Sequence, residues 1–345
     1  MSSVVVRDDL VIGVDVGGTK VAAGLVDPSG EILCHNRNPM VGNASAADGL
    51  ASVVKAIETV SSQAAAVAGE NNLIRGVGIC SPGPLDPKTG IVINPPNLPC
   101  WRNFPLAAEL AQIYRVRVKV DNDANAAGLA ETLWGSGRGY RNVFFATLGT
   151  GIGSAILLDG RIHHGRTGAA GEGGHMSIDY KGPHCGCGKP GCIEVLASGP
   201  AIARRARAKL ESGRASSLLE LASGNNVSSE MVGKAAVAGD ALASEVLHET
   251  VELLACWLGN IIDLLEPEVI IVGGGVASML KPYFPEIVER LPEFAVNERC
   301  QEIPLVSARY GEDAGIAGGA ALCFYEARHS ESHEALRPSE LSLKR

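Results

Sequence analysis

The stretch LVIGVDVGGTKVAAGLVD, residues Leu10–Asp27, sets the architecture of the first part of the chain. An apolar run of strand length ends in the turn Gly17–Lys20, and a second apolar run follows directly, so the pattern predicts a β-hairpin. Dinucleotide-binding and P-loop motifs need a helix after their glycines, which this pattern does not provide. The turn can still offer backbone N–H groups to phosphate oxygens, with Asp15 placed to bind their magnesium ion. An ordinary hairpin without a ligand is the alternative.

A second stretch, VFFATLGTGIGSAILL, repeats this pattern at residues 143–158. Val143–Thr147 and Ile152–Leu158 are predicted strands, joined by Leu148-Gly149-Thr150-Gly151. Its glycines do not complete G-x-G-x-x-G, because position 154 is serine. Two such hairpins, each opening a segment of domain size, indicate a duplicated phosphate-binding arrangement and an α/β chain of two domains.

The segment Gly171–Gly199, GEGGHMSIDYKGPHCGCGKPGCIEVLASG, contains closely spaced metal ligands. His175 is followed by Cys185, Cys187 and Cys192, which together supply the four ligands of a closed tetrahedral zinc site. Glycines between the cysteines allow the backbone to fold tightly around one point. Since four protein ligands leave no position for a metal-bound water, we predict a structural zinc ion. The alternative is three ordinary cysteines in a loop.

Two carboxylates, Glu172 and Glu194, bracket these ligands. A zinc ion would hold both ends of the loop and therefore keep the two carboxylates near each other. Carboxylate oxygens accept hydrogen bonds from the hydroxyl groups of a sugar. The pattern favours a sugar-binding pair, with two solvated glutamates as the alternative.

Three further positions are candidate ligand contacts. The strand Val116–Val120 runs into Asp121-Asn122-Asp123 before a predicted helix, so Asp123 can cap that helix or take a proton from a substrate hydroxyl. Asn97 lies in the proline-rich loop Ile91–Trp101 and can fix a ligand or form a turn. Gly273–Gly275 follows a predicted strand, where it can admit a purine ring or simply make a tight turn.

The composition of the 345 residues narrows the possible partners. A net charge of −8 without a basic cluster argues against nucleic acid. No run of 18 apolar residues predicts a membrane span, and the first residues do not follow the pattern of a signal peptide. Nine cysteines, six of them scattered outside the cluster, indicate free thiols and predict a cytoplasmic protein.

Four segments together resemble the bacterial sugar kinases of the ROK family (repressors, open reading frames, kinases), most closely its glucokinases. They are DVGGTK at 15–20, VDNDANAA at 120–127, LGTGIGSAILLDGRIHHGRTGAAGEGGH at 148–175 and CGCGKPGCIE at 185–194. The resemblance runs from about residue 10 to residue 325. It implies an actin-like ATPase (ribonuclease H-like) fold with two α/β domains around a central cleft. We expect domains at 10–122 and 123–311, a last helix at about 312–326 that packs on the first, and a disordered tail at 329–345.

The resemblance also implies a role for each candidate residue. Asp123 would be the general base that takes the proton of the sugar 6-hydroxyl as it attacks the γ-phosphate of ATP. The expected sugar contacts are Gly83, Asn97, Asn122, Asp123, Glu172, His175 and Glu194. The expected contacts to ATP and its Mg²⁺ are Asp15, Gly17, Gly18, Thr19, Lys20, Gly149, Thr150, Gly151, Gly273, Gly274 and Gly275. Zinc would be held by His175, Cys185, Cys187 and Cys192, with the other ring nitrogen of His175 facing the sugar.

Other members of the family provide the alternatives. Repressor members carry a DNA-binding module ahead of the sugar-binding part, and about nine residues before the first strand are too few for one. A non-catalytic sugar sensor would be expected to lack Asp123 or the phosphate turns. We expect a glucokinase that acts on the 6-hydroxyl of glucose, with an N-acetylglucosamine or N-acetylmannosamine kinase or a fructokinase of the same family as the alternatives. A homodimer is expected, because it is usual among the relatives.

Overall fold

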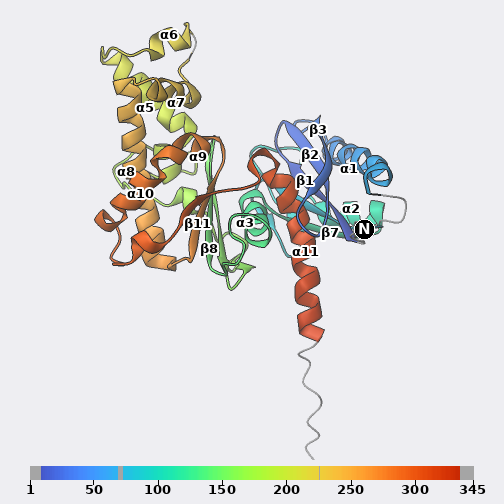
Figure 1. Cartoon of the computed structure of the whole chain (residues 1–345). Coiled ribbons are helices and arrows are strands. Elements are labelled where there is room, and N and C mark those ends of the chain that lie inside the picture. Colours follow the sequence, from blue (N-terminus) through green and yellow to red (C-terminus); the bar gives the residue numbers. More distant parts are fainter. Residues whose placement is uncertain (1–8, 69–72, 225, 335–345) are drawn as a thin grey trace, which may run out of the picture. The chain divides into compact units, whose positions relative to one another are not determined.

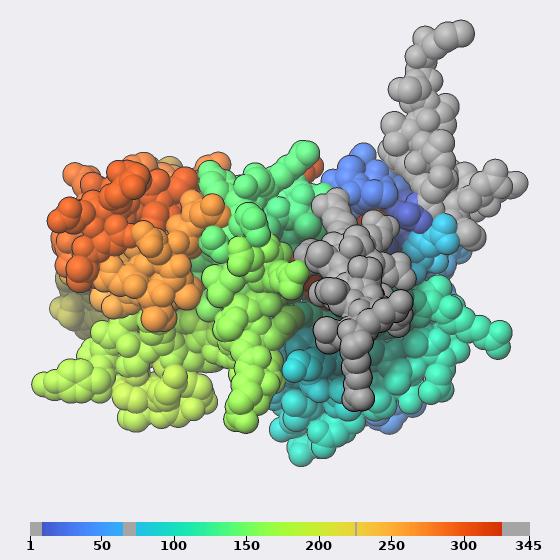
Figure 2. Space-filling model, turned by 90° about the horizontal axis from the view of Figure 1, so that it is seen from below, coloured from blue at the N-terminus to red at the C-terminus, as the bar shows by residue number. Residues whose placement is uncertain are grey.

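The computed structural model describes residues 9–68, 73–224 and 226–334. The chain forms two compact units (Figure 1): Met1–Leu133 together with Asp313–Arg345, and Trp134–Glu312. Each unit is built around a five-stranded mixed sheet. In Figure 2 the surface of the first unit is mainly blue and cyan, and that of the second is green to orange. In the part of the chain that the structure describes, no helix is long and apolar enough to cross a bilayer.

The first sheet has the strand order β3-β2-β1-β4-β7. Its strands are β1 (Asp9–Val16), β2 (Lys20–Val26), β3 (Ile32–Pro39), β4 (Leu73–Ser81) and β7 (Arg117–Asn122). β1, β2 and β3 pair antiparallel, whereas β1, β4 and β7 pair parallel. The predicted hairpin is confirmed, because Val16 pairs with Val21 across the glycine turn. A separate two-stranded ribbon consists of β5 (Leu85–Asp86) and β6 (Ile91–Val92).

The helices of the first unit are α1 (Ala46–Ala68), α2 (Leu106–Tyr114), α3 (Asp123–Leu133) and α11 (Ala314–Glu334). Side chains of β1 alternate between the two faces of the sheet. Ile12 and Val14 are buried in one core cluster with Ile57 of α1. The other face meets α11, which contacts both β1 and β4.

Glycines bring α11 into direct contact with the sheet. An ideal Cβ on Gly13 would lie 1.8 Å from the carbonyl oxygen of Ile316, and one on Gly78 would lie 1.7 Å from that of Gly319. Any side chain at either strand position would overlap the helix backbone, so glycine is required there. Helix α11 is therefore part of the first unit although it comes last in sequence.

Two expected boundaries differ from the structure. We expected the first domain to end at residue 122, but the division falls after Leu133 because α3 packs on α11. An ideal Cβ on Gly318 would lie 2.7 Å from the carbonyl carbon of Ala126, which shows how close the two helices are. The helix also continues to Glu334, so residues 329–334 are helical and do not belong to a tail. Residues 335–345 lie outside the described part of the chain.

The second sheet repeats the topology of the first, in the order β10-β9-β8-β11-β12. Its strands are β8 (Val143–Leu148), β9 (Ile152–Leu158), β10 (Arg161–Ile162), β11 (Val269–Gly273) and β12 (Leu305–Ser307). β8, β9 and β10 pair antiparallel, whereas β8, β11 and β12 pair parallel. The predicted second hairpin is thus confirmed, and it opens the second sheet as the first hairpin opens the first.

Helices cover the second sheet and build its core. They are α4 (Ile193–Ala197), α5 (Gly199–Glu211), α6 (Leu218–Ala222), α7 (Ser229–Val237), α8 (Ala241–Leu265), α9 (Gly275–Leu280) and α10 (Phe284–Arg290). Short 3₁₀ helices are η1 (Gly173–His175), η2 (Lys281–Tyr283), η3 (Leu291–Glu293), η4 (Cys300–Glu302) and η5 (Gly311–Asp313). In the core, the rings of Phe144 and Trp257 meet edge to face with centroids 5.6 Å apart.

Candidate active site and metal cluster

Polar groups gather where three parallel strands of the first sheet end. Asp15 pairs with Cys80, Cys80 with Asp121, and Ser81 with Asn122. The carboxyl ends of neighbouring parallel strands share one edge of a sheet, which is the usual place for a ligand in α/β folds. The structure therefore brings Asp15, Asn122 and the start of α3 to a single edge.

Asp123 is the first residue of α3, and its side chain is exposed. The backbone N–H of Ala124 donates to Asn122 Oδ1 at 2.9 Å and to Asp123 Oδ1 at 2.8 Å, so both residues help to cap the helix. Beneath them, buried Asp121 accepts hydrogen bonds from the Asn122 backbone at 2.7 Å and from Asn125 Nδ2 at 3.0 Å. These contacts fix the helix start, and with it the position of the Asp123 carboxylate.

Opposing effects act on the pKa of the Asp15 carboxyl group. Burial raises its pKa above the usual value, and the nearby cations Lys20 and Arg37 lower it in part. The Cys80 thiol beside it is fully buried and donates to the Gly315 carbonyl oxygen at 3.0 Å. Burial, then the charges of Asp15, Asp123 and Asp121, raise the pKa of Cys80 well above its usual range. The thiol therefore stays neutral, and the charge at this edge comes from the carboxylates.

The first glycine turn packs against the loop that carries Asn97. Gly17 N–H donates to the Lys20 carbonyl oxygen at 2.9 Å and closes the turn. An ideal Cβ on Gly18 would lie 2.5 Å from the Asn97 carbonyl oxygen, so glycine is required there. Gly83 lies near Asn122, whose Nδ2 would be 3.6 Å from an ideal Cβ on that glycine. Gly18 is thus a neighbour of Asn97, and Gly83 is a neighbour of Asn122, as expected of residues around one ligand site.

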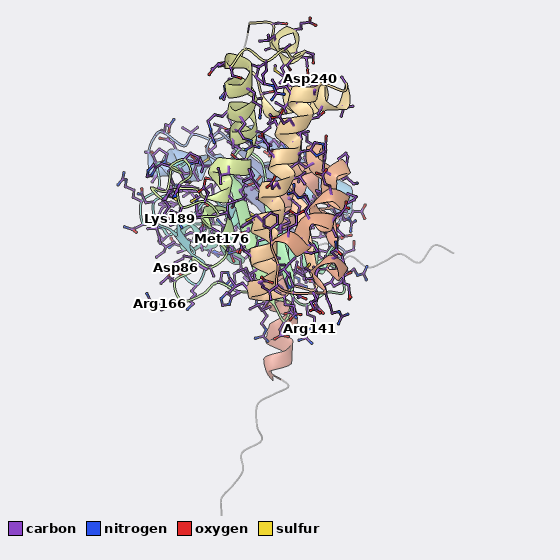
Figure 3. The ribbon with its side chains drawn as sticks, turned by 90° about the vertical axis from the view of Figure 1, so that its left-hand side faces the viewer. Asp86, Arg141, Arg166, Met176, Lys189 and Asp240 are labelled. Atoms are coloured by element: carbon purple, nitrogen blue, oxygen red, sulfur yellow. The ribbon has the colours of Figure 1, made fainter. Side chains whose placement is uncertain are left out.

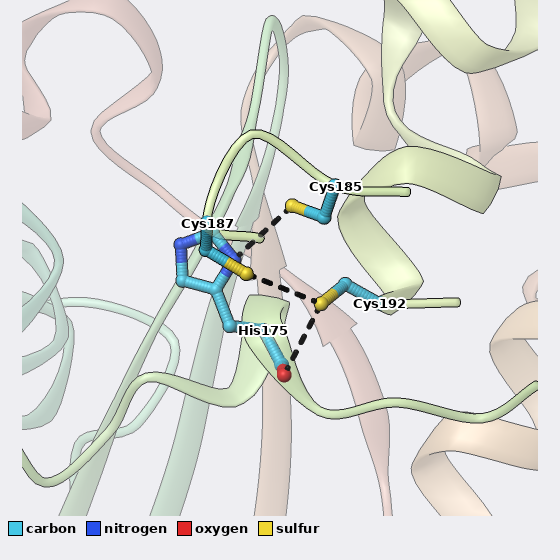
Figure 4. A group of neighbouring side chains, drawn as sticks. All are labelled: His175, Cys185, Cys187 and Cys192. Atoms are coloured by element: carbon cyan, nitrogen blue, oxygen red, sulfur yellow. Dashed lines mark hydrogen bonds between the residues drawn. The ribbon is translucent and has the colours of Figure 1, made fainter. Parts of the chain in front are cut away.

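In the second unit, His175, Cys185, Cys187 and Cys192 form one cluster (Figure 4). Their ligand atoms all lie within 4.8 Å of one another. Cys185 Sγ is 3.6 Å from His175 Nδ1, and Cys187 Sγ is 3.6 Å from Cys192 Sγ. A tetrahedral zinc ion with sulfur bonds of about 2.3 Å separates its ligand atoms by about 3.8 Å, whereas a disulfide needs about 2.05 Å. The residues fit zinc, and the structure brings together all four predicted ligands.

The three thiols differ in their readiness to ionise without a cation. Burial raises the pKa of Cys192 to about 12 and also raises the pKa of Cys185. A backbone hydrogen bond at Lys189 lowers the pKa of the exposed Cys187 thiol. Since zinc binds cysteine as the thiolate, all three cysteines would bind it without their thiol protons, and Nδ1 is the nitrogen of His175 that faces the sulfurs.

The loop that carries the cysteines is shaped by its own backbone. Cys185 N–H donates to the Lys189 carbonyl oxygen at 2.8 Å, which closes the turn that carries Cys185 and Cys187. Gly191 has φ +62°, and an ideal Cβ there would lie 1.7 Å from the Asp179 carbonyl oxygen. Figure 3 labels Met176, which directly follows His175, and Lys189, which lies between Cys187 and Cys192. Glycine is thus required at position 191 for a steric reason.

Glu194 lies between the zinc cluster and the second glycine turn. Its Oε2 accepts a hydrogen bond from the Ile152 backbone at 3.0 Å, and its Oε1 lies 3.7 Å from Cys185 Sγ and 4.0 Å from His175 Nδ1. Glu172 is exposed, and its carboxylate makes no hydrogen bond or ion pair within the described residues. Of the two predicted sugar-binding carboxylates, Glu194 is therefore held by a backbone hydrogen bond, whereas Glu172 is exposed to solvent.

The second glycine turn meets two other segments of its unit. Gly199 N–H, at the start of α5, donates to the Gly149 carbonyl oxygen at 2.9 Å, so the positive end of a 13-residue helix lies beside the turn. Gly274 has φ +92°, and an ideal Cβ there would lie 2.4 Å from the Leu148 carbonyl oxygen. Gly273 is buried in β11, whereas Gly275 is exposed with open space beside it.

Two supporting residues were missed from the sequence. The buried Ser154 hydroxyl donates to the Gly171 carbonyl oxygen at 2.7 Å and accepts from Gly173 N–H at 3.0 Å. Trp257 Nε1 donates to the Gly173 carbonyl oxygen at 3.1 Å. Together they hold the turn that presents Glu172 and His175. The only signal in the sequence was the serine that interrupts the glycine pattern at position 154.

Comparison with known proteins identifies the family. The sequence model of the ROK family matches residues 11–325. The chain belongs to the ROK family. It is 35% identical over 314 residues to a glucokinase of Thermotoga maritima, an alignment that covers 90% of this chain and 96% of the relative. It is 30% identical to an N-acetylmannosamine kinase of Shigella boydii, with 90% and 97% of the two chains covered.

A solved ROK structure shows the same fold. The glucokinase of Streptomyces griseus, crystallised with glucose and AMPPNP, superposes with a TM-score of 0.73 at 33% identity, covering 91% of this chain and 98% of that one. The duplicated mixed sheets described above match it, so the predicted actin-like ATPase fold is confirmed. The resemblance read from the four sequence segments is confirmed as well.

Proposed function

We propose that this ROK protein is a glucokinase, which transfers the γ-phosphate of ATP to the 6-hydroxyl of glucose. The observation that carries the proposal is the Asp123 carboxylate, exposed at the start of α3 where β7 ends. The support from relatives is the 33% identity to the Streptomyces griseus glucokinase, which was crystallised with glucose and AMPPNP.

In the proposed reaction, Asp123 accepts the proton of the 6-hydroxyl as its oxygen forms a bond to the γ-phosphorus. The bond between the γ-phosphorus and the bridging oxygen breaks, and ADP leaves with that oxygen. Phosphoryl transfer needs positioning and charge neutralisation more than covalent chemistry from the protein. The fixed helix start, with Asp121 beneath it, supports this positional role for Asp123.

The two glycine turns are proposed to bind the phosphates of ATP. Gly17, Gly18, Thr19 and Lys20 would do so in the first unit, and Gly149, Thr150 and Gly151 in the second. The start of α5 beside Gly149 adds a helix N-terminus, which favours an anion. Asp15 would bind the magnesium ion of the nucleotide, and Gly273–Gly275 would lie beside the adenosine.

Sugar recognition is proposed to use hydroxyl contacts from Gly83, Asn97, Asn122, Glu172, His175 and Glu194. A zinc ion bound to His175, Cys185, Cys187 and Cys192 would act structurally, because four protein ligands leave no open position for chemistry. With Nδ1 facing the sulfurs, the Nε2 side of His175 is left for the sugar. The cluster would thus orient one sugar contact and hold Glu194 beside it.

The test is ATP-dependent phosphorylation of glucose, mannose, fructose, N-acetylglucosamine and N-acetylmannosamine, with kcat/KM for each. We expect glucose to exceed the others by about tenfold or more, a difference of about 1.4 kcal/mol in transition-state binding. Equal or better turnover of an acetamido sugar would reject the glucokinase assignment and leave the kinase chemistry in place. No turnover of any sugar would favour a non-catalytic sugar sensor.

An N-acetylmannosamine kinase is the second candidate, because the Shigella boydii enzyme of that name is 30% identical over 90% of this chain. N-Acetylglucosamine and fructose are further candidate substrates. These sugars differ from glucose at the 2-position or in ring type, so the same panel distinguishes them.

Assembly and location stay predictions. We propose a homodimer, which the resemblance to the family implies, and a chain mass of 35.8 kDa makes the dimer easy to distinguish by light scattering. A cytoplasmic location, suggested by the free thiols, is checked by cell fractionation. We expect no binding to DNA, which a gel-shift assay tests.

A further inference from the structure

The first residues of β9 support both segments that are proposed to bind the sugar in the second unit. Ser154 holds the turn Gly171–Gly173 through two hydrogen bonds, and Ile152 N–H donates to Glu194 at 3.0 Å. An ideal Cβ on Gly174 would lie 1.7 Å from the Ile152 carbonyl oxygen, so the 3₁₀ helix η1, Gly173–His175, also packs on this strand. β9 begins directly after the Gly149–Gly151 turn.

Glu194 makes the most direct connection between this turn and the metal cluster. One carboxylate oxygen binds the first N–H after the turn, and the other faces Cys185 and His175 at 3.7 and 4.0 Å. An ideal Cβ on Gly151 would lie 2.7 Å from Glu194 Oε2, so the turn has glycine where the carboxylate needs room. By contrast, a Cβ on Gly149 would meet nothing within 4 Å.

The helix that carries Glu194 is itself restrained. Arg204 and Arg205 donate to the carbonyl oxygens of Val195 and Leu196, near the end of α4. Gly151, Glu194 and the cluster therefore form one continuous set of contacts.

We propose that Glu194 is a positioning residue for the phosphate turn, so that sugar bound at Glu194 strengthens the binding of the nucleotide, and the nucleotide strengthens that of the sugar. This inference rests on the proposed function, because it takes Gly149–Gly151 as a phosphate contact and Glu194 as a sugar contact. A sugar hydroxyl on the carboxylate restrains it, and through Ile152 N–H it restrains the turn. A nucleotide that binds the restrained turn loses less conformational entropy on binding. By linkage, the two ligands must favour each other by the same factor.

The experiment measures this coupling on the full, zinc-loaded chain by calorimetry. The dissociation constant of glucose is determined alone and with a saturating non-hydrolysable ATP analogue and Mg²⁺, and their ratio is the coupling factor. We expect a factor of about 10 for the unsubstituted protein, within the usual range for linked sites. Glu194→Ala should reduce the ratio to about 1, whereas Glu172→Ala should weaken glucose binding and keep the ratio near 10. Loss of a direct contact to glucose weakens binding equally with and without the ATP analogue, so it does not change the ratio of the two dissociation constants.

A second pair of variants leaves both carboxylates in place. Gly151→Ala places a methyl group against Glu194 Oε2 and should reduce the ratio, whereas Gly149→Ala points into open space and should keep it. Hydrogen exchange of the segment 148–154 provides an independent readout. In the Glu172→Ala protein, saturating glucose alone should slow the exchange of segment 148–154. In the Glu194→Ala protein, it should leave that exchange unchanged.

Three outcomes would overturn the inference. A coupling factor near 1 in the unsubstituted protein would do so, as would an unchanged factor in both Glu194→Ala and Gly151→Ala. Exchange in the segment 148–154 that does not respond to glucose would also contradict it. Each of these differs from failure of the proposed function, which would appear as no binding of glucose or nucleotide by the unsubstituted protein and would remove the basis of the inference.

Discussion

Gly315, in the first turn of α11, lies directly against the carboxylate of Asp15 at the end of β1. An ideal Cβ on Gly315 would come within 2.4 Å of Asp15 Cγ and 2.7 Å of Oδ2. The last helix of the chain thus covers a carboxylate near its beginning, and burial raises the pKa of Asp15. The half-buried negative charge of Asp15, which the proposed magnesium ion would neutralise, costs stability when no cation is bound.

Asp15→Asn should therefore stabilise the ligand-free protein and impair catalysis. The raised pKa means that the ionised form disfavours folding at neutral pH, a cost that declines as pH falls through the folded-state pKa. We expect the free energy of unfolding at pH 7 to rise by about 0.5–2 kcal/mol, measured with urea. With one magnesium ligand lost, kcat/KM for MgATP should fall by about 100-fold.

The control is Asp9→Asn at the opposite end of the same strand. Asp9 is exposed and pairs with Arg75 at 2.7 Å, so its loss should change stability by less than about 1 kcal/mol and leave catalysis intact. Unchanged use of MgATP by Asp15→Asn would show that Asp15 has no role at the metal.

Asp123→Asn tests the proposed general base. The amide keeps the shape and can still accept from Ala124 N–H, so the helix start should survive. It cannot take a proton, and we expect kcat to fall by about 10²–10⁴-fold with the dissociation constant for glucose changed only a few-fold. Kinetics and calorimetry on one preparation give both values. Asp86→Asn, in β5, is the control, and substantial turnover by the Asp123→Asn protein would exclude this residue as the base.

Cys187→Ser tests the zinc cluster. Cys187 is the exposed ligand, so its replacement leaves the core intact and removes one of four ligands. We expect bound zinc, measured by elemental analysis, to fall from about one per chain to near zero, and glucose affinity to fall by about 10–100-fold because His175 and Glu194 lose their support. Cys256→Ser, half-buried on α8, should retain zinc. A zinc-free native protein with full glucose affinity would contradict the role assigned to the cluster.

Asp240 provides a test of pH dependence. Its side chain, labelled in Figure 3, caps α8. The carboxylate accepts hydrogen bonds from the backbone N–H of Ala243 at 2.9 Å and from that of Ser217 at 2.7 Å. Burial raises its pKa, but these hydrogen bonds outweigh burial and lower the pKa to about 2, from an ordinary value of 3.8. A lowered pKa stabilises the fold above pH 3.8, and this contribution is lost as pH falls from there towards 2.

Asp240→Asn should cost about 1 kcal/mol at pH 7, less than the full linkage value because water reaches the half-buried carboxylate. The cost should shrink as pH falls below 4. Ser228→Ala is the matched control, because the Ser228 hydroxyl caps α7 without a charge and its loss should cost the same at each pH. Urea unfolding at pH 7, 4 and 3 measures both, and a cost for Asp240→Asn that does not depend on pH would contradict the assignment.

The sequence alone determined the two glycine hairpins, the cluster of one histidine and three cysteines that fits zinc, and the location of Asp123 between a strand and a helix. Each of these depends on residues close together in the chain: apolar runs that pair across a short turn, or a histidine and three cysteines within 18 residues. Local spacing is enough for such features, because short loops restrict which backbone conformations are possible.

Only the tertiary structure decided how these parts are joined. Gly315 against Asp15, Gly18 against Asn97, and Ser154 beneath Gly173 are contacts between segments far apart in sequence, and most involve backbone atoms. A backbone atom is the same at every residue, so it leaves no pattern of side chains from which its partner can be read. The same holds for Glu194, which sequence spacing marks only as a carboxylate near a metal. Its bond to the Ile152 N–H exists because the fold brings α4 to the start of β9.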